Sequence, residues 1–400
     1  MSKIEWTEAT WNPLTGCTKV SAGCKNCYAE RLAKRLKAMG QPQYQDVLTD
    51  SGRWNGEISF VETVLLQPLQ RKKPTMYFVN SMSDVFHEAV RTEWIDQIFA
   101  VMALCPQHTF QILTKRPERM AAYLTERGSA ASPKDAGAAA ERLGAIFADI
   151  AFMHGKVGAK AMKRAIAWLE RNNQVSHLGW MPVWPLLNVW LGTSVENQAA
   201  ADERIPHLLQ TPAAVRFLSC EPLLGPVDIG MQSATCDCCS RHPGRWIRTN
   251  KLVTSDLPGL IRPFKSALPG VYRAHSNQHG ALSVETSSGR LGVYPSEFEY
   301  LPRLDWVICG GESGPGARPM HPDWARGLRD QCQAAGVPYF FKQWGEFYPC
   351  EAVPSSAWGE GRSFAFEDGQ QLVRLGKKVA GRELDGRTWD EMPTPAQVAA

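Results

Sequence analysis

Short runs of apolar residues recur along the chain, and the segments between them often have the spacing of amphipathic helices. Each apolar run leads directly into polar or charged residues. Continuous apolar strands that alternate with helices are typical of a parallel sheet whose two faces are both buried. We therefore predict an α/β fold, a partial TIM-type (βα)6 barrel with a mostly parallel sheet. Its six strands are expected at residues 76–79, 109–113, 188–191, 215–218, 304–308 and 337–341, with a further short strand before Cys17.

Two segments interrupt this rhythm and divide the chain. Residues 128–187 begin with an Ala, Gly and Ser-rich piece, continue with helical patterns and end in a Trp and Pro-rich stretch, which predicts a helical insertion. Residues 229–302 are rich in turn formers and alternate polar with β-branched residues, which predicts a small β-rich insertion. The barrel is then expected in residues 1–127, 188–228 and 303–348, with an irregular tail in residues 349–400.

Polar residues at the carboxyl ends of the strands are the first candidates for a functional site. Those ends meet at one edge of a parallel sheet, where barrels and open α/β sheets bind their ligands. An ordinary network of salt bridges is the alternative explanation for the charged members of this set. The catalytic candidates are Lys115, Glu196, Glu221, Glu312 and Lys342.

Three cysteines stand within eleven residues near the start of the chain, with the spacing C-x6-C-x2-C. They are Cys17, Cys24 and Cys27. Three thiolates can hold one soft metal centre and leave a coordination position open. Structural zinc normally takes four ligands, and the histidine nearest in sequence is His87. Zinc with a distant fourth ligand and unligated thiols therefore both remain alternatives.

The segment after these cysteines has the pattern of an amphipathic helix. Tyr28, Leu32 and Leu36 recur at helical spacing and form its apolar stripe, while charged residues fill the other positions. Gly40 stands where a C-terminal cap belongs. The two later cysteines would then sit at or just before the start of the helix, where unpaired amides favour anionic sulfur.

The sequence around the cysteines resembles the opening of radical S-adenosylmethionine enzymes, above all the spore photoproduct lyase-like branch. Asn12-Pro13, Gly16-Cys17 and Cys24-x-x-Cys27-Tyr28-Ala29 match that opening, with a first cysteine gap of six residues where the branch usually has three. Leu113-Thr114-Lys115 looks like a strand end of the same branch. More closely, the chain resembles a phage-associated three-cysteine family of radical-SAM-like proteins without a settled activity, over residues 10–29, 191–198, 219–227 and 306–344.

The resemblance implies a [4Fe-4S] cluster on the three cysteines, with S-adenosylmethionine bound at the open iron. Such a cluster needs an external electron donor. The lyase-like relatives act on nucleic acid, so a nucleobase, a nucleoside or nucleic acid is the expected substrate, and a phage-encoded protein is an expected partner. The three sulfurs should lie together and face the strand ends. The expected contacts to the cofactor are Asn80, Ser81, Asp84, Thr193 and Ser194, among which Ser81 and Asp84 are preferred.

A second group of metal-ligand residue types lies in the predicted β-rich insertion, at Cys236, Cys238, Cys239 and His242. These side chains suit zinc, although adjacent cysteines cannot easily share one tetrahedral ion. Basic residues and Trp246 flank them, a mixture found both in nucleic-acid contacts and on ordinary solvated surfaces. The alternative to a radical enzyme is therefore a zinc-stabilised phage protein that binds nucleic acid or a partner without radical chemistry.

Composition limits these hypotheses only broadly. A formal charge of +4, from 44 basic and 40 acidic residues, is too small to argue for nucleic-acid binding by itself. The chain has neither a signal-peptide pattern nor a run of about 18 apolar residues, so we expect a cytoplasmic protein without a membrane partner. In that reducing compartment Cys105, Cys309, Cys332 and Cys350 are expected to be buried thiols.

Overall fold

The computed structural model describes residues 4–128, 155–172, 185–229, 304–352 and 362–394, together with the backbone of five short strands within residues 230–303. The chain groups into two compact units. Unit 1 comprises residues 1–193, 211–216 and 394–400, and unit 2 comprises residues 194–210 and 217–393. The second predicted metal group, Cys236, Cys238, Cys239 and His242, lies outside the described residues.

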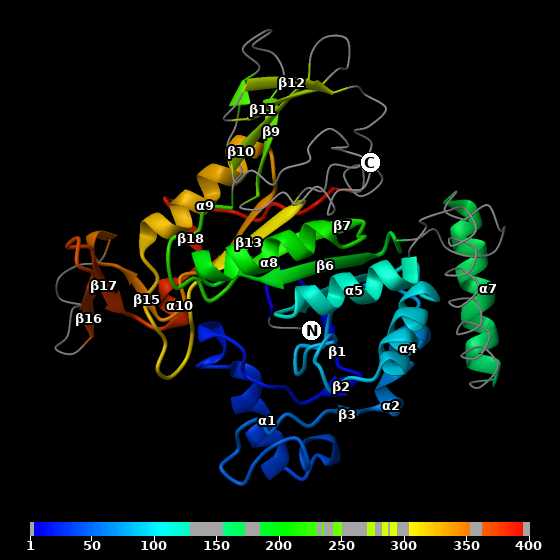
Figure 1. Cartoon of the computed structure of the whole chain (residues 1–400). Helices are drawn as coiled ribbons and strands as arrows, with labels where there is room; N and C mark the ends of the chain where they lie inside the picture. The colour runs from blue at the N-terminus through cyan, green and yellow to red at the C-terminus, as the bar shows by residue number, and fades with distance from the viewer. Residues whose placement is uncertain are drawn as a thin grey trace. The chain divides into compact units, whose positions relative to one another are not determined.

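A seven-stranded sheet is the largest sheet of the fold (Figure 1). Its strands follow sequence order and pair in parallel. Sequential parallel strands joined by helices are the arrangement of a partial barrel, so the predicted α/β fold is confirmed. In sheet order the strands are β1 (Ala9–Trp11), β4 (Met76–Val79), β5 (Thr109–Thr114), β6 (Val189–Ser194), β7 (Val215–Cys220), β13 (Trp306–Gly310) and β14 (Tyr339–Gln343). The six predicted strands are all among them, and β1 is the short strand expected before the first cysteine.

The continuous apolar character of these strands is explained by the packing within each unit. In unit 1 the Trp11 and Phe110 side chains are fully buried, with ring centroids 5.5 Å apart. In unit 2 the Phe217 and Trp306 side chains are fully buried, with ring centroids 5.7 Å apart. A strand that is covered on both faces has no polar side to show, so its sequence does not alternate.

Helices follow the strands at the predicted places. In α9 the Asp323 amide donates to the His321 Nδ1 atom at 3.1 Å, Pro322 occupies the first turn and Gly336 ends the helix in a left-handed conformation. No helix in the described ranges combines the length and the apolar character that a membrane span requires. The longer helices are α1 (Tyr28–Ala38), α4 (Thr92–Ala103), α5 (Pro117–Gly128), α7 (Gly155–Arg171), α8 (Gln198–Gln210) and α9 (Pro322–Ala335); the short ones are α2 (Glu62–Leu65), α3 (Gln67–Gln70) and α10 (Lys377–Ala380).

The buried face of α1 differs from the predicted apolar stripe. Ala29 and Ala33 are buried and, with Leu36, pack against a cluster formed by Tyr44, Val47, Leu48 and Met82. Tyr28 and Leu32 are instead 51% and 41% exposed. Small alanines allow the chain after the helix to approach closely, so the buried face is rotated away from the larger apolar residues.

The β-rich insertion is confirmed by a five-stranded antiparallel sheet of order β12-β11-β10-β9-β8. Of the predicted helical insertion, the described residues contain α7 and residues 185–187, directly before β6. The strands of the antiparallel sheet are β8 (Ala234–Thr235), β9 (Pro243–Thr249), β10 (Gly270–Ser276), β11 (Leu282–Thr286) and β12 (Gly289–Val293).

Residues 349–400, predicted as an irregular tail, contain regular elements. The Phe341 amide donates to the Trp389 carbonyl oxygen at 2.9 Å, so the chain near Trp389 pairs with strand β14 at the edge of the sheet. Strands of two to four residues are too short to produce a periodic pattern, which is why the sequence did not predict them. The remaining short strands are β2 (Leu14–Thr15), β3 (Ser59–Phe60), β15 (Phe347–Pro349), β16 (Ser363–Ala365), β17 (Gln371–Arg374), β18 (Glu383–Leu384) and β19 (Arg387–Thr388).

Gly311, directly after β13, occupies a position without room for a side chain. A Cβ atom there would lie 1.9 Å from the Trp344 carbonyl oxygen. We expect Gly311→Ala to lower the free energy of unfolding by at least about 1–3 kcal/mol in urea denaturation, because the backbone must shift. Gly327→Ala within α9 is the control, since a Cβ there meets nothing within 4 Å; it should be neutral or stabilising by about 0.5–1 kcal/mol. Equal stability of the two variants would contradict this account.

Candidate functional site

The three predicted cluster ligands lie in unit 1, on the loop between β2 and α1. Gly16 sets the path of the chain before Cys17, with a φ of +101° and a carbonyl oxygen of Glu57 that would lie 2.1 Å from any Cβ. Cys24 ends a short 3-10 helix (Ala22–Cys24), and Cys27 is the N-cap residue of α1. All three are half-buried free thiols. The predicted place of the later cysteines, at the start of the helix, is confirmed.

Burial favours the neutral thiol of Cys17. Its pKa is raised to about 12, chiefly by burial and further by the Asp84 carboxylate, while the Arg116 guanidinium lowers it. The thiols of Cys27 and Cys24 also raise the pKa, so the three sulfurs are near enough to influence one another. Among the residues that the structure describes, however, no group of three His, Cys, Asp or Glu side chains is placed to hold a metal ion. The sulfurs thus share one loop without forming a ready-made set of ligands.

The thiol state of Cys17 can be tested by alkylation of the metal-free protein. Because the thiolate is the nucleophile, iodoacetamide should modify Cys17 slowly near pH 7 and steadily faster as the pH rises. Arg116→Gln removes a charge that lowers the pKa, so it should slow the reaction further. Peptide mass spectrometry gives the rates. A Cys17 that reacts near pH 7 as fast as free cysteine would show that its pKa is not raised.

Asp84 is the centre of a hydrogen-bond network at the ends of β4 and β5. One carboxylate oxygen accepts from the Phe86 amide (3.0 Å) and the Thr114 hydroxyl (2.7 Å). The other accepts from the Lys115 amide (3.1 Å) and the Arg116 guanidinium (3.2 Å). Asp84 is only 6% exposed, and these four donors stabilise its buried negative charge in place of water. The carboxylate, predicted as a cofactor contact, fixes the loop after β4 to the end of β5.

Arg116 joins this network to the cysteine loop. Its Nη2 atom donates to the Thr18 hydroxyl at 2.7 Å, one residue after Cys17, and its Nε atom donates to Glu88 at 2.7 Å. Arg116 is 8% exposed. Sequence reasoning missed this residue, although it follows Lys115 in the Thr-Lys-Arg sequence at a strand end. Between two adjacent basic residues, the sequence pattern cannot tell which one turns inward.

His87, the nearest histidine in sequence, lies beside the loop but is already engaged. Its Nε2 atom is 2.9 Å from the Thr18 hydroxyl, and its Nδ1 atom accepts from the Ala89 amide at 3.1 Å. Burial lowers the pKa of His87, and the Arg116 charge lowers it further. The imidazole is therefore neutral near pH 7, with both nitrogens occupied. To serve as a fourth zinc ligand, His87 would have to give up the contact at the nitrogen that binds the ion.

Two polar atoms after β4 lack partners. Asn80, at a φ of +55°, accepts at Oδ1 from the Leu14 amide (3.2 Å), whereas its Nδ2 atom is buried without a partner. The Ser83 hydroxyl is likewise buried without a partner, and Ser83 forms a backbone bridge with Gly16 of the cysteine loop. Ser81 differs, because its hydroxyl donates to the Asn12 side chain at 3.0 Å. Unpartnered buried polar groups are uncommon and mark a place where a ligand can supply the missing bonds.

Two further predicted residues of unit 1, Thr193 and Lys115, make ordinary hydrogen bonds within the fold. The Thr193 hydroxyl donates to the Thr114 carbonyl oxygen at 2.9 Å and is fully buried between β5 and β6. Lys115 is half-buried, with its amide on the Asp84 network. Hydrogen bonds therefore join Lys115 to Asp84 and Thr193 to Thr114 at these strand ends, and the Thr193 bond connects two strands of the sheet.

Glu221 and Lys342, two catalytic candidates, form an ion pair in unit 2. The Lys342 ammonium lies 2.7 Å from one Glu221 oxygen and 2.8 Å from the other. The Gln343 amide nitrogen also donates to Glu221, at 3.1 Å, and the Gln343 amide oxygen is buried without a partner. The two predicted residues therefore meet at the ends of β7 and β14.

The remaining candidates of unit 2 also pair with basic side chains. Arg204 donates to Glu196 at 2.9 Å and to the Ser194 carbonyl oxygen at 2.9 Å, in a fully buried setting. Arg318 donates twice to Glu312, at 2.8 and 2.7 Å. Salt bridges, named as the alternative for the charged strand-end residues, thus engage each of these glutamates. The sequence had offered no partner for either.

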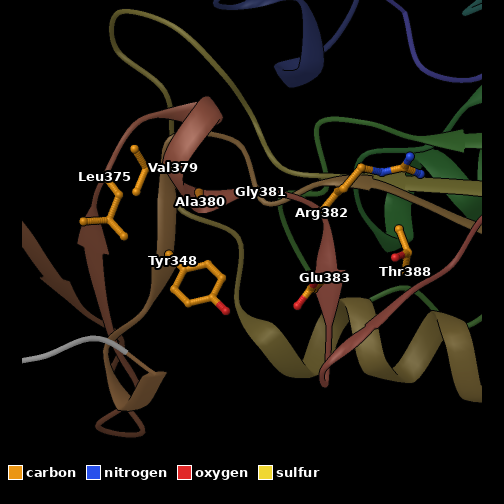
Figure 2. A pocket seen from close by; sticks show the side chains of 8 residues that line it. All are labelled: Tyr348, Leu375, Val379, Ala380, Gly381, Arg382, Glu383 and Thr388. Carbon is orange, nitrogen blue, oxygen red and sulfur yellow. The ribbon is translucent and has the colours of Figure 1, made fainter.

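Unit 2 also contains a hollow of about 590 Å³ (Figure 2). It is lined by Tyr348, Leu375, residues 379–383 and Thr388. Arg382 extends away from Tyr348, and its guanidinium pairs with Asp390 and lies 5.0 Å from the Phe340 ring centre. None of the predicted site residues lines this hollow.

One protein-family model matches nearly the whole chain. Residues 1–393 match the model of a protein family of unknown function, DUF5131. The chain belongs to the DUF5131 family. No curated protein and no solved structure shows significant similarity to it. Membership in DUF5131 therefore assigns the chain to a family and does not assign it an activity.

The isolated cysteines of this DUF5131 chain are buried free thiols, as predicted. Cys105, Cys309, Cys332 and Cys350 are each at most 2% exposed. Burial raises the pKa of each thiol, which keeps it in the unreactive neutral form. Cysteines with greater exposure are found only in the loop before α1, among the residues described.

Proposed function

We propose that the chain is an iron-sulfur enzyme of the radical S-adenosylmethionine type, with Cys17, Cys24 and Cys27 as the cluster ligands. The observation that carries this proposal is the location of three half-buried free thiols on one loop after the first parallel strand, beside the polar loop after β4. A working site at the carboxyl ends of parallel strands is the general rule for such sheets.

The donor set fits an iron-sulfur centre by its chemistry, since soft thiolates are the usual ligands of iron-sulfur clusters. The three sulfurs, however, are not yet positioned to bind a cluster together. Because the three do not form a metal-binding group, residues 17–27 must draw together when a cluster assembles. Binding must also remove the Cys17 proton, which the Arg116 charge assists. Zinc is less well supported, because His87 has both ring nitrogens engaged.

A cluster with an open iron would supply the electron that cleaves S-adenosylmethionine. The chain itself would hold the cofactor through the loop after β4. The Asn80 Nδ2 atom is a free donor for the methionine carboxylate, and the Ser83 hydroxyl can accept from the methionine amino group. Ser81 and Asp84 already have protein partners, so they would position this loop. A nucleobase, free or in nucleic acid, is the proposed substrate class, on the resemblance alone.

The proposal is tested by anaerobic reconstitution with iron and sulfide, followed by metal and acid-labile sulfide analysis. We expect about four iron and four sulfide per chain and little zinc. Cys105→Ala, which removes a buried thiol outside the loop, should load equally well. A protein that takes up one zinc per chain and no iron would contradict the proposal and support the zinc-stabilised binding protein instead.

A further inference from the structure

The hollow of unit 2 has the size and the fixed walls of a preformed binding site. Its volume of about 590 Å³ falls within the roughly 300–1,000 Å³ of small-molecule sites. The segment after β14 holds the lining backbone in place. The Trp344 amide donates to the Gly381 carbonyl oxygen at 3.1 Å, and the Trp344 indole nitrogen donates to the Glu383 carbonyl oxygen at 2.7 Å. The Leu375 amide donates to the Glu346 carbonyl oxygen at 3.0 Å. Walls that are already held by hydrogen bonds lose little freedom when a ligand binds.

One side of the hollow is apolar. It is formed by the Leu375, Val379 and Ala380 side chains and the Tyr348 ring (Figure 2). The Tyr348 ring lies edge-on to the Trp344 ring, with centroids 5.7 Å apart. Val379 is 70% exposed, the highest fraction among the large apolar residues that the structure describes. A ligand with an apolar body would remove these side chains from water, which favours binding.

The hollow also holds polar groups that nothing else in the fold uses. Within the described part of the chain, the Tyr348 hydroxyl, the Glu383 carboxylate and the Thr388 hydroxyl have no hydrogen-bond or ion-pair partner. Glu383 and Thr388 stand directly opposite each other in the β18–β19 hairpin, which places their side chains on one face. Figure 2 shows the Tyr348 hydroxyl and the Glu383 carboxylate pointing toward each other from opposite sides. Hydrogen-bond acceptors with one negative charge therefore line the hollow.

The unpaired charge of Glu383 selects the class of ligand. Arg382, the one basic residue of the lining, is already engaged by Asp390 and by the Phe340 ring. An anion would be repelled by Glu383, and a neutral ligand would displace water from the carboxylate without replacing its hydrogen bonds. A metal ion is disfavoured because the lining holds a single carboxylate. An ammonium group carries three N–H donors and no acceptor, which matches the free oxygen atoms.

We propose that the hollow binds an ammonium group carried on an apolar stem. Glu383 is its ionic partner, Thr388 and Tyr348 accept its remaining hydrogen bonds, and Leu375 and Val379 cover the stem. A free amine and the side chain of a lysine in a polypeptide present the same chemistry. The lining lies entirely within unit 2, whereas the cysteine loop belongs to unit 1, so this site does not rest on the proposed enzyme function.

Titration calorimetry of the full chain with phenethylamine measures binding, and 2-phenylethanol and 3-phenylpropionate carry the same ring with a neutral and an anionic end. Near pH 7 the amine should bind about 10-fold or more tightly than either analogue. Glu383→Gln should weaken amine binding by about 10-fold, and Tyr348→Phe, which keeps the ring, by about 2–10-fold. The control Glu367→Gln changes an exposed carboxylate of the same unit outside the lining and should bind like the wild type. A capped tripeptide with a central lysine, and its acetyl-lysine form, test the polypeptide source.

Each outcome decides the proposal. A preference for phenethylamine that Glu383→Gln removes and Glu367→Gln retains supports the site and assigns it to free amines. Binding of the lysine peptide with the same dependence on Glu383, and its loss on acetylation, supports the site and assigns it to a polypeptide side chain. The proposal is overturned if either analogue binds the wild type as tightly as the amine, or if Glu383→Gln binds like the control. It is also overturned if neither the amine nor the peptide binds. The analogue series uses the wild type alone, so it decides even if a variant fails to fold.

Discussion

Replacing Asp84 by alanine is expected to lower the free energy of unfolding by about 3–5 kcal/mol. The substitution removes the acceptor of four hydrogen bonds and leaves the buried Arg116 guanidinium with only the exposed Glu88 carboxylate. A buried charge that keeps only an exposed partner is costly, and the loss falls on the ends of both β4 and β5. Urea denaturation, combined with hydrogen exchange of the β4 and β5 amides, measures the change.

The matched control for this prediction is Asp50→Ala, which removes an exposed carboxylate in the same unit. It should change the stability by no more than about 0.5 kcal/mol. If Asp84→Ala were as stable as this control, the network would not hold the strand ends together. The hydrogen bond from Arg116 to Thr18 would then not support the cysteine loop.

Replacing Cys24 by serine is expected to reduce iron after reconstitution from about four per chain to less than one. Serine offers a hard oxygen that is protonated at neutral pH, so it cannot replace a thiolate in a soft-metal centre. Cys27→Ser should have the same effect. Metal analysis of the purified variants measures it, with Cys105→Ala as the control that keeps all three ligands. Retention of full iron by the Cys24 variant would exclude this cysteine as a ligand.

The six longer strands of the sheet were predictable because they are largely buried on both faces, which leaves an unbroken apolar run in the sequence. Tyr28 and Leu32 show the limit of such patterns. Their spacing is that of a buried stripe, yet Ala29 and Ala33 face the core because the segment after α1 packs closely on these small residues. Packing between segments is not encoded in the period of one helix.

The candidate site was predictable in location and less so in detail. The polar residues after β4 and β5 do meet, because the ends of neighbouring parallel strands lie at one edge. Which of them are free could not be predicted: Asp84 is fully hydrogen-bonded, while Asn80 has an unpartnered nitrogen. Arg116 was missed because its role depends on Thr18, which is 98 residues away along the chain.

The most direct test of the central claim is electron paramagnetic resonance of the reduced, reconstituted protein with and without S-adenosylmethionine, followed by analysis of the products. The account predicts a cluster signal that added S-adenosylmethionine perturbs, and cleavage of the cofactor to 5'-deoxyadenosine under reducing conditions. An iron-loaded protein whose signal is unchanged by S-adenosylmethionine, and which leaves the cofactor intact, would contradict the account.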